Sequence, residues 1–134
     1  MFVLTVEDYF SSAHQLRGYK GKCENIHGHN WRVVLSVQGE VLNEIGLLID
    51  FHELKDILRK ITSSLDHKNI NEIEPFTAIN PSSENIAEFI AEKVQENITK
   101  INPSLYVESV TVWESQTSRC TFYPNGAAPI KNNS

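Results

Sequence analysis

The chain has 134 residues, a length typical of one folded domain that buries its own core. Its formal net charge is -5 and its sequence pI is about 5.5, which argues against a nucleic acid or an anionic membrane as the main partner. The start lacks a basic segment and no apolar run approaches the ~20 residues of a membrane span, so we expect neither a signal peptide nor a membrane anchor. Only two cysteines occur, so we expect reduced thiols and a cytoplasmic location.

Two strands are predicted in the first third of the chain, without a helix-length segment between them. Residues 2 to about 10 or beyond alternate β-branched or aromatic residues with polar ones, and residues 30–41 repeat the pattern. The connection over residues 17–28 contains several glycines and is long for a compact domain, which favours a functional loop. We therefore expect the two strands to pair antiparallel and to be joined by a functional loop.

Two amphipathic helices are predicted next. Asp50 is placed to cap the first, with Glu53 three residues later in the spacing of a capping box. After a loop with two prolines, residues 82–98 show the second helical pattern. The expected core positions are Phe51, Leu54, Leu58, Ile61 and Leu65 in the first helix, and Ile86, Phe89, Ile90, Val94 and Ile98 in the second.

Two closing strands are predicted over residues 106–115 and 118–124, and the polar tail that follows is expected to be flexible. The order of elements is thus ββααββ, an α+β arrangement. We expect a single domain over residues 1–124 and a tail over residues 125–134.

His27 and His29 lie two residues apart at the start of the second strand, where the pleat points both imidazoles to one face. If the two strands pair, His14 reaches the same face, and three protein nitrogens with an open fourth position are typical of a catalytic zinc site. Two alternatives stay open. In the first, the histidines are ordinary polar side chains. In the second, they form a cupin-type metal site, although such a site needs an acid soon after the second histidine and none occurs before Glu40.

Three further segments carry reactive side chains, each with an ordinary structural alternative. Cys23 lies four residues before His27, where a thiol beside a metal would act as a base or nucleophile. The structural alternative is that Cys23 is a small, buried apolar residue. Asp66 and His67 put an acid beside an imidazole, although a histidine at a helix C-terminus also complements the helix dipole. Glu114 would accept two parallel N–H bonds from a planar ligand edge, or it is solvated.

The chain resembles the 6-pyruvoyl-tetrahydropterin synthase family, which includes 6-carboxy-tetrahydropterin synthase. The resemblance covers nearly all of residues 2–123 and rests on six segments in the family's order: SSAH, CENIHGHN, GLLIDF, LDHKNIN, NPSSENIA and VWESQTS. It implies the tunnelling fold (T-fold), in which ββααββ subunits pair their sheets edge to edge into an oligomeric β-barrel. It also implies a homo-oligomer, a hexamer built as a dimer of trimers, with sites between subunits.

The resemblance further implies a zinc-dependent lyase whose substrate is the small molecule 7,8-dihydroneopterin triphosphate. Glu84 matches a second pterin contact, although an acid in the first turn of a helix also has a structural explanation. The assigned residues are, for zinc, His14, His27 and His29; for proton transfer, Cys23, Asp66 and His67; and for substrate binding, Glu114, Glu84 and Glu24.

The family divides by product, and the spacing of the motif favours one branch. Three residues separate Cys23 from His27, as in the enzymes that form 6-carboxy-5,6,7,8-tetrahydropterin for queuosine and 7-deazapurines, whereas five are typical of the pyruvoyl-forming enzymes. Glu24 also matches the ExxHGH pattern of enzymes that form 6-hydroxymethyl-7,8-dihydropterin for folate. The resemblance therefore implies either or both activities, unless Glu24 is only a loop acid. A non-catalytic zinc or pterin-binding protein is the alternative of a different class, and the presence of Cys23, Asp66 and His67 argues against it.

Overall fold

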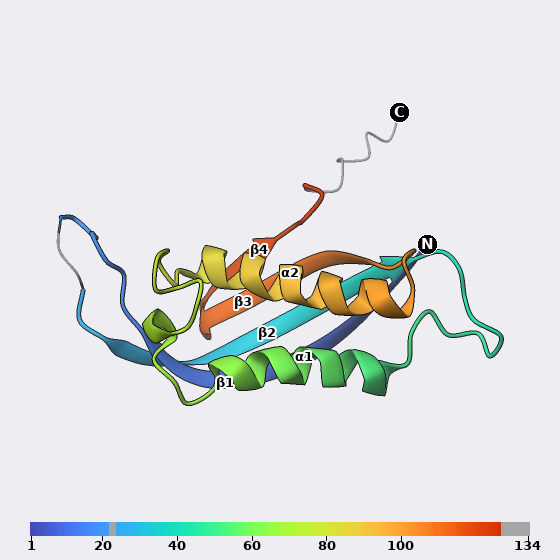
Figure 1. Ribbon diagram of the computed structural model, residues 1–134, viewed down its shortest axis with the longest axis horizontal. Coiled ribbons are helices and arrows are strands. Elements are labelled where there is room, and N and C mark those ends of the chain that lie inside the picture. Colours follow the sequence, from blue (N-terminus) through green and yellow to red (C-terminus); the bar gives the residue numbers. More distant parts are fainter. Residues whose placement is uncertain (22–23, 127–134) are drawn as a thin grey trace.

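The computed structural model describes residues 1–21 and 24–126, which form four strands and two long helices (Figure 1). The ββααββ order is confirmed, with one additional short 3-10 helix, η1, between the two long helices. The elements are β1 (Phe2–His14), β2 (His27–Gly39), α1 (Phe51–Leu65), η1 (Ile70–Glu72), α2 (Ser83–Ile101), β3 (Tyr106–Ser115) and β4 (Ser118–Phe122). No helix in these described ranges is both long and apolar enough to span a bilayer.

The strands form one antiparallel sheet in the order β1-β2-β3-β4. Both helices lie on the same face of this sheet, with α1 packed on β1 and α2 packed on β3 and β4 (Figure 1). The strand expected over residues 30–41 begins earlier, at His27, because its pairing with β1 continues down to the pair His14 and His27. It also ends earlier, at Gly39. Strand β1 and strand β4 are the two borders of the sheet.

The core lies between the sheet and the two helices. Alternate residues of β2, among them Trp31, Val33 and Leu35, are fully buried against the helix layer. Eight of the ten helical positions expected in the core are buried, and two are not. Phe51 is 51% exposed because it lies in the first turn of α1 on the side of the border strand, and Phe89 is half-buried with its ring against the edge of another aromatic ring.

The starts of both helices are fixed by side-chain caps. The Asp50 carboxylate accepts a hydrogen bond from the backbone N–H of His52 at 2.7 Å, so the expected capping box with Glu53 does not form in its full pattern. The Ser82 hydroxyl accepts from the backbone N–H of Asn85 at 3.1 Å. This second cap fixes the first turn of α2 over the end of the sheet that carries the histidines.

The single-domain organisation stays a prediction. The expected tail over residues 125–134 lies outside the described residues from residue 127 onward, and so does the predicted catalytic Cys23.

Candidate metal and active site

Four potential metal ligands meet at one end of the sheet, on its helix-covered face. The ligand atoms of His14, His27, His29 and Glu114 all lie within 4.8 Å of one another. His14 is paired with His27 in the β1–β2 register, and the two-residue period of the pleat puts His29 on the same face. Regular pairing of three strands is therefore enough to assemble the cluster.

Backbone carbonyls orient two of the imidazoles. His14 Nδ1 lies 2.7 Å from the carbonyl oxygen of Pro81, and His27 Nδ1 lies 2.9 Å from that of Asn25. Since a carbonyl only accepts, each Nδ1 carries the proton, and each Nε2 keeps a free lone pair. This is the arrangement in which a protein presents an imidazole to a metal.

The buried nitrogens of the cluster have no hydrogen-bond partner of their own. Within residues 1–21 and 24–126, His14 Nε2 and His29 Nε2 are buried and make no hydrogen bond. A buried polar atom without a partner costs free energy, so it signals a missing ligand. His29 Nε2 does lie 3.3 Å from Glu114 Oε1, an ion-pair distance at which the two groups still make no hydrogen bond.

The electrostatic environment keeps His29 ready for a metal. Burial lowers the pKa of His29, the Glu114 carboxylate raises it, and His14 and His27 lower it further, with a net shift below its usual value. The imidazole is therefore neutral at neutral pH, the form that binds metal. Three imidazoles and one carboxylate are a donor set that suits zinc, so the residues present fit this ion.

Glu114 lies closer to the histidines than the sequence indicated. Arg32 is paired with Trp113 in the β2–β3 register, so the next residue of β3 arrives beside the cluster. Its Oε2 accepts a hydrogen bond from the Ser83 hydroxyl at 3.1 Å, in the first turn of α2. The pairing of the strand over residues 106–115 with the histidine strand was the signal that could have found this proximity. Its predicted role as a pterin contact stays a prediction, and its place in the cluster also makes it a potential fourth ligand.

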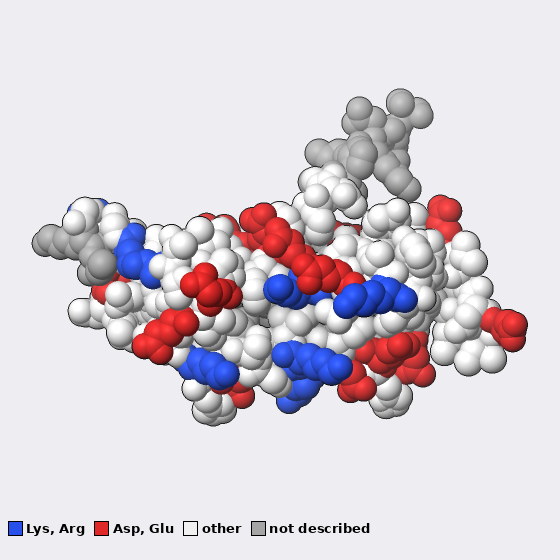
Figure 2. All heavy atoms as spheres, in the orientation of Figure 1, with Lys and Arg blue, Asp and Glu red and all other residues white. Residues whose placement is uncertain are grey.

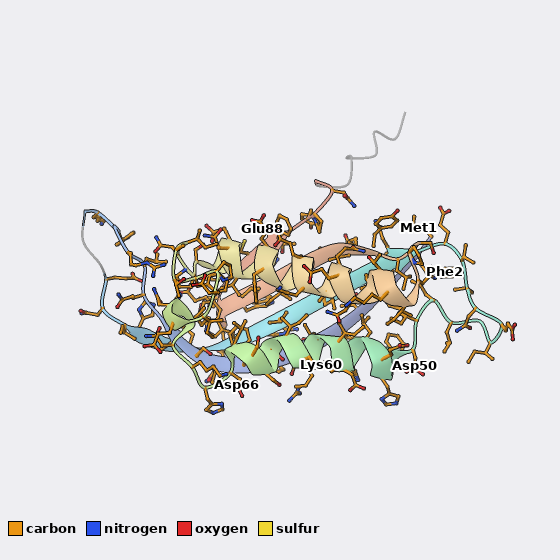
Figure 3. The ribbon with its side chains drawn as sticks, viewed as in Figure 1. Met1, Phe2, Asp50, Lys60, Asp66 and Glu88 are labelled. Atoms are coloured by element: carbon orange, nitrogen blue, oxygen red, sulfur yellow. The ribbon has the colours of Figure 1, made fainter. Side chains whose placement is uncertain are left out.

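Asp66 and His67 contact each other through their side chains, but they do not join the histidine cluster of their own chain. His67 Nδ1 lies 2.8 Å from Asp66 Oδ2, and Asp66 Oδ1 accepts from the backbone N–H of Ser11 on the border strand β1 at 2.8 Å. Figure 3 shows Asp66 beyond the last turn of α1, at the border of the molecule. The His67 side chain is 81% exposed.

Hydrogen bonds set the charge of the Asp66 carboxyl. The Ser11 N–H and, second, the hydrogen bond from His67 hold the pKa of the Asp66 carboxyl below its usual value. The carboxylate is therefore ionised at neutral pH and stands ready to orient the imidazole beside it.

The remaining predicted site residues differ in their surroundings. Glu24 accepts a hydrogen bond from the backbone N–H of Leu16 at 3.0 Å, and its own N–H donates to the Leu16 carbonyl at 3.0 Å. These two bonds hold together the two sides of the loop between β1 and β2. Its Oε1 also lies 3.8 Å from His27 Nδ1. Glu84 is exposed in the first turn of α2 and makes no hydrogen bond or ion pair with another described residue.

Comparison with known proteins identifies the family. The family model described as 6-pyruvoyl tetrahydropterin synthase matches residues 3–125. The chain is 38% identical over 100 residues, 66% of its length and 74% of the other, to 6-pyruvoyl tetrahydrobiopterin synthase of Dictyostelium discoideum. It is 31% identical over 144 residues, 91% of its length and 99% of the other, to 6-carboxy-5,6,7,8-tetrahydropterin synthase of Haemophilus influenzae.

The solved structures agree. The 6-pyruvoyl tetrahydropterin synthase of Caenorhabditis elegans superimposes with a TM-score of 0.76 at 31% identity, covering 92% of this chain and 96% of that one. This similarity confirms the expected T-fold subunit. The chain belongs to the 6-pyruvoyl tetrahydropterin synthase family.

Proposed function

We propose that this protein is a zinc-dependent lyase that converts 7,8-dihydroneopterin triphosphate, with water consumed, into 6-carboxy-5,6,7,8-tetrahydropterin, acetaldehyde and triphosphate. The observation that carries the proposal is the cluster of three histidines, two of which keep a buried Nε2 without a hydrogen-bond partner in the described part of the chain. Family membership supports the pterin substrate, and the three-residue spacing between Cys23 and His27 supports the carboxy product. A relative from Haemophilus influenzae carries the name of that activity.

His14, His27 and His29 would hold the zinc ion. A zinc ion bound there supplies Lewis-acid polarisation of the oxygens of the substrate side chain, which makes a neighbouring C–H group more acidic. The Pro81 and Asn25 carbonyls fix two of the rings, so the ligands are oriented before any ion binds.

The proton transfers are assigned to side chains outside the cluster. Cys23 would remove a proton from the substrate side chain as general base. His67 would be the partner acid–base group, which gives or takes a proton at the substrate side chain. Asp66, ionised because the Ser11 N–H and His67 lower its pKa, would hold the imidazole in place. Since this pair is exposed at the β1 border and outside its own histidine cluster, we assign it to the site of a neighbouring copy.

Glu114 would recognise the pterin. Its carboxylate can accept two parallel N–H bonds from the amino group and ring N–H of the pterin, and the Ser83 hydroxyl orients it. Glu84, exposed one residue after Ser83, is the second proposed contact.

A second candidate activity is cleavage of the side chain to 6-hydroxymethyl-7,8-dihydropterin. The observation that favours it is Glu24, which completes an ExxHGH pattern and has Oε1 3.8 Å from His27 Nδ1. The same oxygen is engaged by the Leu16 N–H, which favours a bracing role instead.

One experiment tests both candidates. The purified zinc-loaded protein is incubated with 7,8-dihydroneopterin triphosphate, and the pterins are separated and identified by mass. We expect 6-carboxy-5,6,7,8-tetrahydropterin as the main product, and a minor hydroxymethyl product that disappears in Glu24→Ala if the second activity exists. A pyruvoyl product would assign the protein to the other branch of the family. Tight binding without any product would instead indicate a non-catalytic pterin-binding protein.

A further inference from the structure

The loop over residues 66–80 covers the outer edge of β1 near its end (Figure 1). The Ala13 N–H donates to the Lys68 carbonyl at 3.0 Å. Backbone groups that point away from the neighbouring strand recur at every second residue, so Gln15 and Arg17 are the next positions along the same edge. The loop must therefore satisfy the N–H and the carbonyl of both of these residues.

Two asparagine side chains do so, in the place of a neighbouring strand. Asn71 Oδ1 accepts from the Gln15 N–H at 2.8 Å, and Asn71 Nδ2 donates to the Gln15 carbonyl at 2.9 Å. Asn80 makes the same pair of bonds with the backbone of Arg17, both at 2.9 Å. A side-chain amide carries an acceptor and a donor side by side, so each asparagine pairs with both backbone groups of one residue. The two asparagines are thus alike in what their side chains contact.

Only Asn80 is also connected to the histidine cluster. Its own backbone carbonyl accepts a hydrogen bond from Asn85 Nδ2, in the first turn of α2, at 2.8 Å. The next residue is Pro81, whose carbonyl oxygen lies 2.7 Å from His14 Nδ1. Asn80 therefore joins the end of β1, the start of α2 and the carbonyl that orients His14.

The backbone after Asn80 has little freedom to absorb a displacement. Proline fixes its own φ, and the residue before a proline is restricted to extended conformations. Pro81 is buried, and Ser82 after it is held as the N-cap of α2, at a φ of -69° and a ψ of 163°. A movement of Asn80 is therefore passed on to the Pro81 carbonyl.

The Arg17 side chain anchors the same loop independently of the Asn80 side chain. Its Nη2 donates to the carbonyl of Phe76 at 2.6 Å and to the carbonyl of Ile79 at 2.7 Å. The loop thus stays attached to the end of β1 when the Asn80 amide is removed. What is lost is the restraint on the residue that precedes Pro81.

The Pro81 carbonyl decides which nitrogen of His14 is free. His14 is 2% exposed, and its Nε2 makes no hydrogen bond with any residue in the described part of the chain. With the proton on Nδ1, Nε2 keeps a lone pair for an ion. With the proton on Nε2, that nitrogen is a buried donor without an acceptor and offers no lone pair. A displaced carbonyl would make both arrangements accessible.

We propose that Asn80 is a positioning residue of the metal cluster. By tying the end of β1 to the start of α2, it keeps the Pro81 carbonyl on His14 Nδ1, so that Nε2 stays open to an ion. This inference goes beyond the proposed function, because it assigns a residue outside the ligand set. It rests on that function only for the binding of zinc and does not depend on turnover.

The test compares Asn80→Ala with Asn71→Ala as the matched control. Each variant removes two side-chain hydrogen bonds to the backbone of the same segment, so we expect both to lower Tm by a similar amount. Neither variant alters the charged surface drawn in Figure 2, because asparagine and alanine are both uncharged. Circular dichroism of the full chain verifies the fold.

The first measurement is the position of the His14 proton in the metal-free protein. Long-range ¹H–¹⁵N NMR at mildly alkaline pH distinguishes a ring protonated on Nδ1 from one protonated on Nε2. We expect the Nδ1 form of His14 alone in the wild type and in Asn71→Ala, and a mixture of both forms in Asn80→Ala. His27, whose Nδ1 contacts the Asn25 carbonyl, should keep a single form in all three proteins.

The second measurement is the zinc affinity, obtained by competition with a chromophoric chelator. Groups that hold a metal-binding imidazole in place typically account for about 10- to 100-fold in metal affinity, and Asn80 acts through one such group. We therefore expect the Kd for zinc to rise about 10-fold in Asn80→Ala and less than about twofold in Asn71→Ala.

The proposal is overturned if folded Asn80→Ala keeps only the Nδ1 form of His14, or if Asn71→Ala changes the proton position and the zinc affinity equally. Should Asn80→Ala not fold, Asn80→Asp takes its place, since it keeps the acceptor for the Arg17 N–H and loses only the donor to the Arg17 carbonyl. A wild-type proton position in that variant would also overturn the proposal. A wild-type chain that binds no zinc would contradict the proposed function, while the proton position would still test the role of Asn80.

Discussion

The histidine cluster and the Asp66–His67 pair lie at the same end of the molecule, but a single chain prepares them to different degrees. The cluster is built on three paired strands, with His14 2% exposed and hydrogen-bonded to a backbone carbonyl. The pair stands at the border, with its imidazole 81% exposed. The difference indicates that one chain by itself brings the potential metal ligands together, whereas the proposed proton-transfer pair is left open to solvent in the same chain.

The largest expected effect comes from breaking the cluster. His27→Ala removes one of three imidazoles, and because two protein ligands rarely hold zinc in a catalytic site, zinc content and turnover should both fall to a small fraction of wild type. Elemental analysis of the purified protein measures the metal. The control is His52→Ala, which removes an exposed histidine from the first turn of α1. Full zinc occupancy in His27→Ala would contradict the assignment.

The next effect separates the two regions directly. Cys23→Ala and His67→Ala should each lower turnover by ~10²-fold or more while zinc content stays at the wild-type level. If the pair serves the site of a neighbouring copy, co-expression of the two variants should restore part of the activity, because mixed particles contain some sites with both groups intact. Mixed particles as inactive as either parent would place Cys23 and His67 in the same copy's site.

An effect on binding is expected at Glu114, which belongs to the cluster and to the proposed pterin site. Glu114→Gln keeps the size of the side chain but replaces one acceptor by a donor, which should weaken binding of a pterin analogue by about 2 to 5 kcal/mol. Titration of the analogue and elemental analysis are done on the same sample. Weaker binding with full zinc indicates a pterin contact, whereas loss of zinc indicates a fourth ligand. An unchanged dissociation constant with full zinc would remove Glu114 from the site.

The smallest effect concerns the stability that the border pair contributes. The folded pKa of Asp66 is lowered by the Ser11 N–H and His67, so the ionised carboxyl stabilises the fold above its unfolded pKa, and this stability is lost as the pH falls through the folded pKa. Asp66→Asn should therefore lower Tm slightly at pH 7, and the difference from wild type should vanish at strongly acidic pH. Asp56→Asn, an exposed position on α1, is the control. A difference that persists unchanged in acid would contradict this origin.

The order of the strands and helices and the shared face of the histidines could be predicted from the sequence, because both depend on the periodicity of residue types. Alternation in the strands and the helical stripes predicted ββααββ, and a two-residue period predicted that His27 and His29 share a face. The same logic correctly brought His14 near them once the strands were taken to pair.

The irregular parts were not accessible, because they depend on contacts between distant segments. The left-handed backbone of His67, at a φ of 55°, and the hydrogen bond from Ser11 to Asp66 direct the pair to the border, and neither has a local signature. Glu24 shows the same limit, since its carboxylate is bound by the N–H of Leu16 eight residues earlier. Phe51 matched the apolar stripe but lies in the first turn of α1, where its side chain stays 51% exposed.

The first turn of α2 is tied to the cluster at two points, through the Pro81 carbonyl on His14 and the Ser83 hydroxyl on Glu114. An ion that binds only the folded cluster therefore also raises the free energy needed to open this turn, by mass action. Amide hydrogen exchange at the start of α2 should slow as metal is added and quicken when a chelator removes it, while exchange near the far end of the helix changes less. The helix start would thus report metal occupancy in a sample that contains no substrate at all.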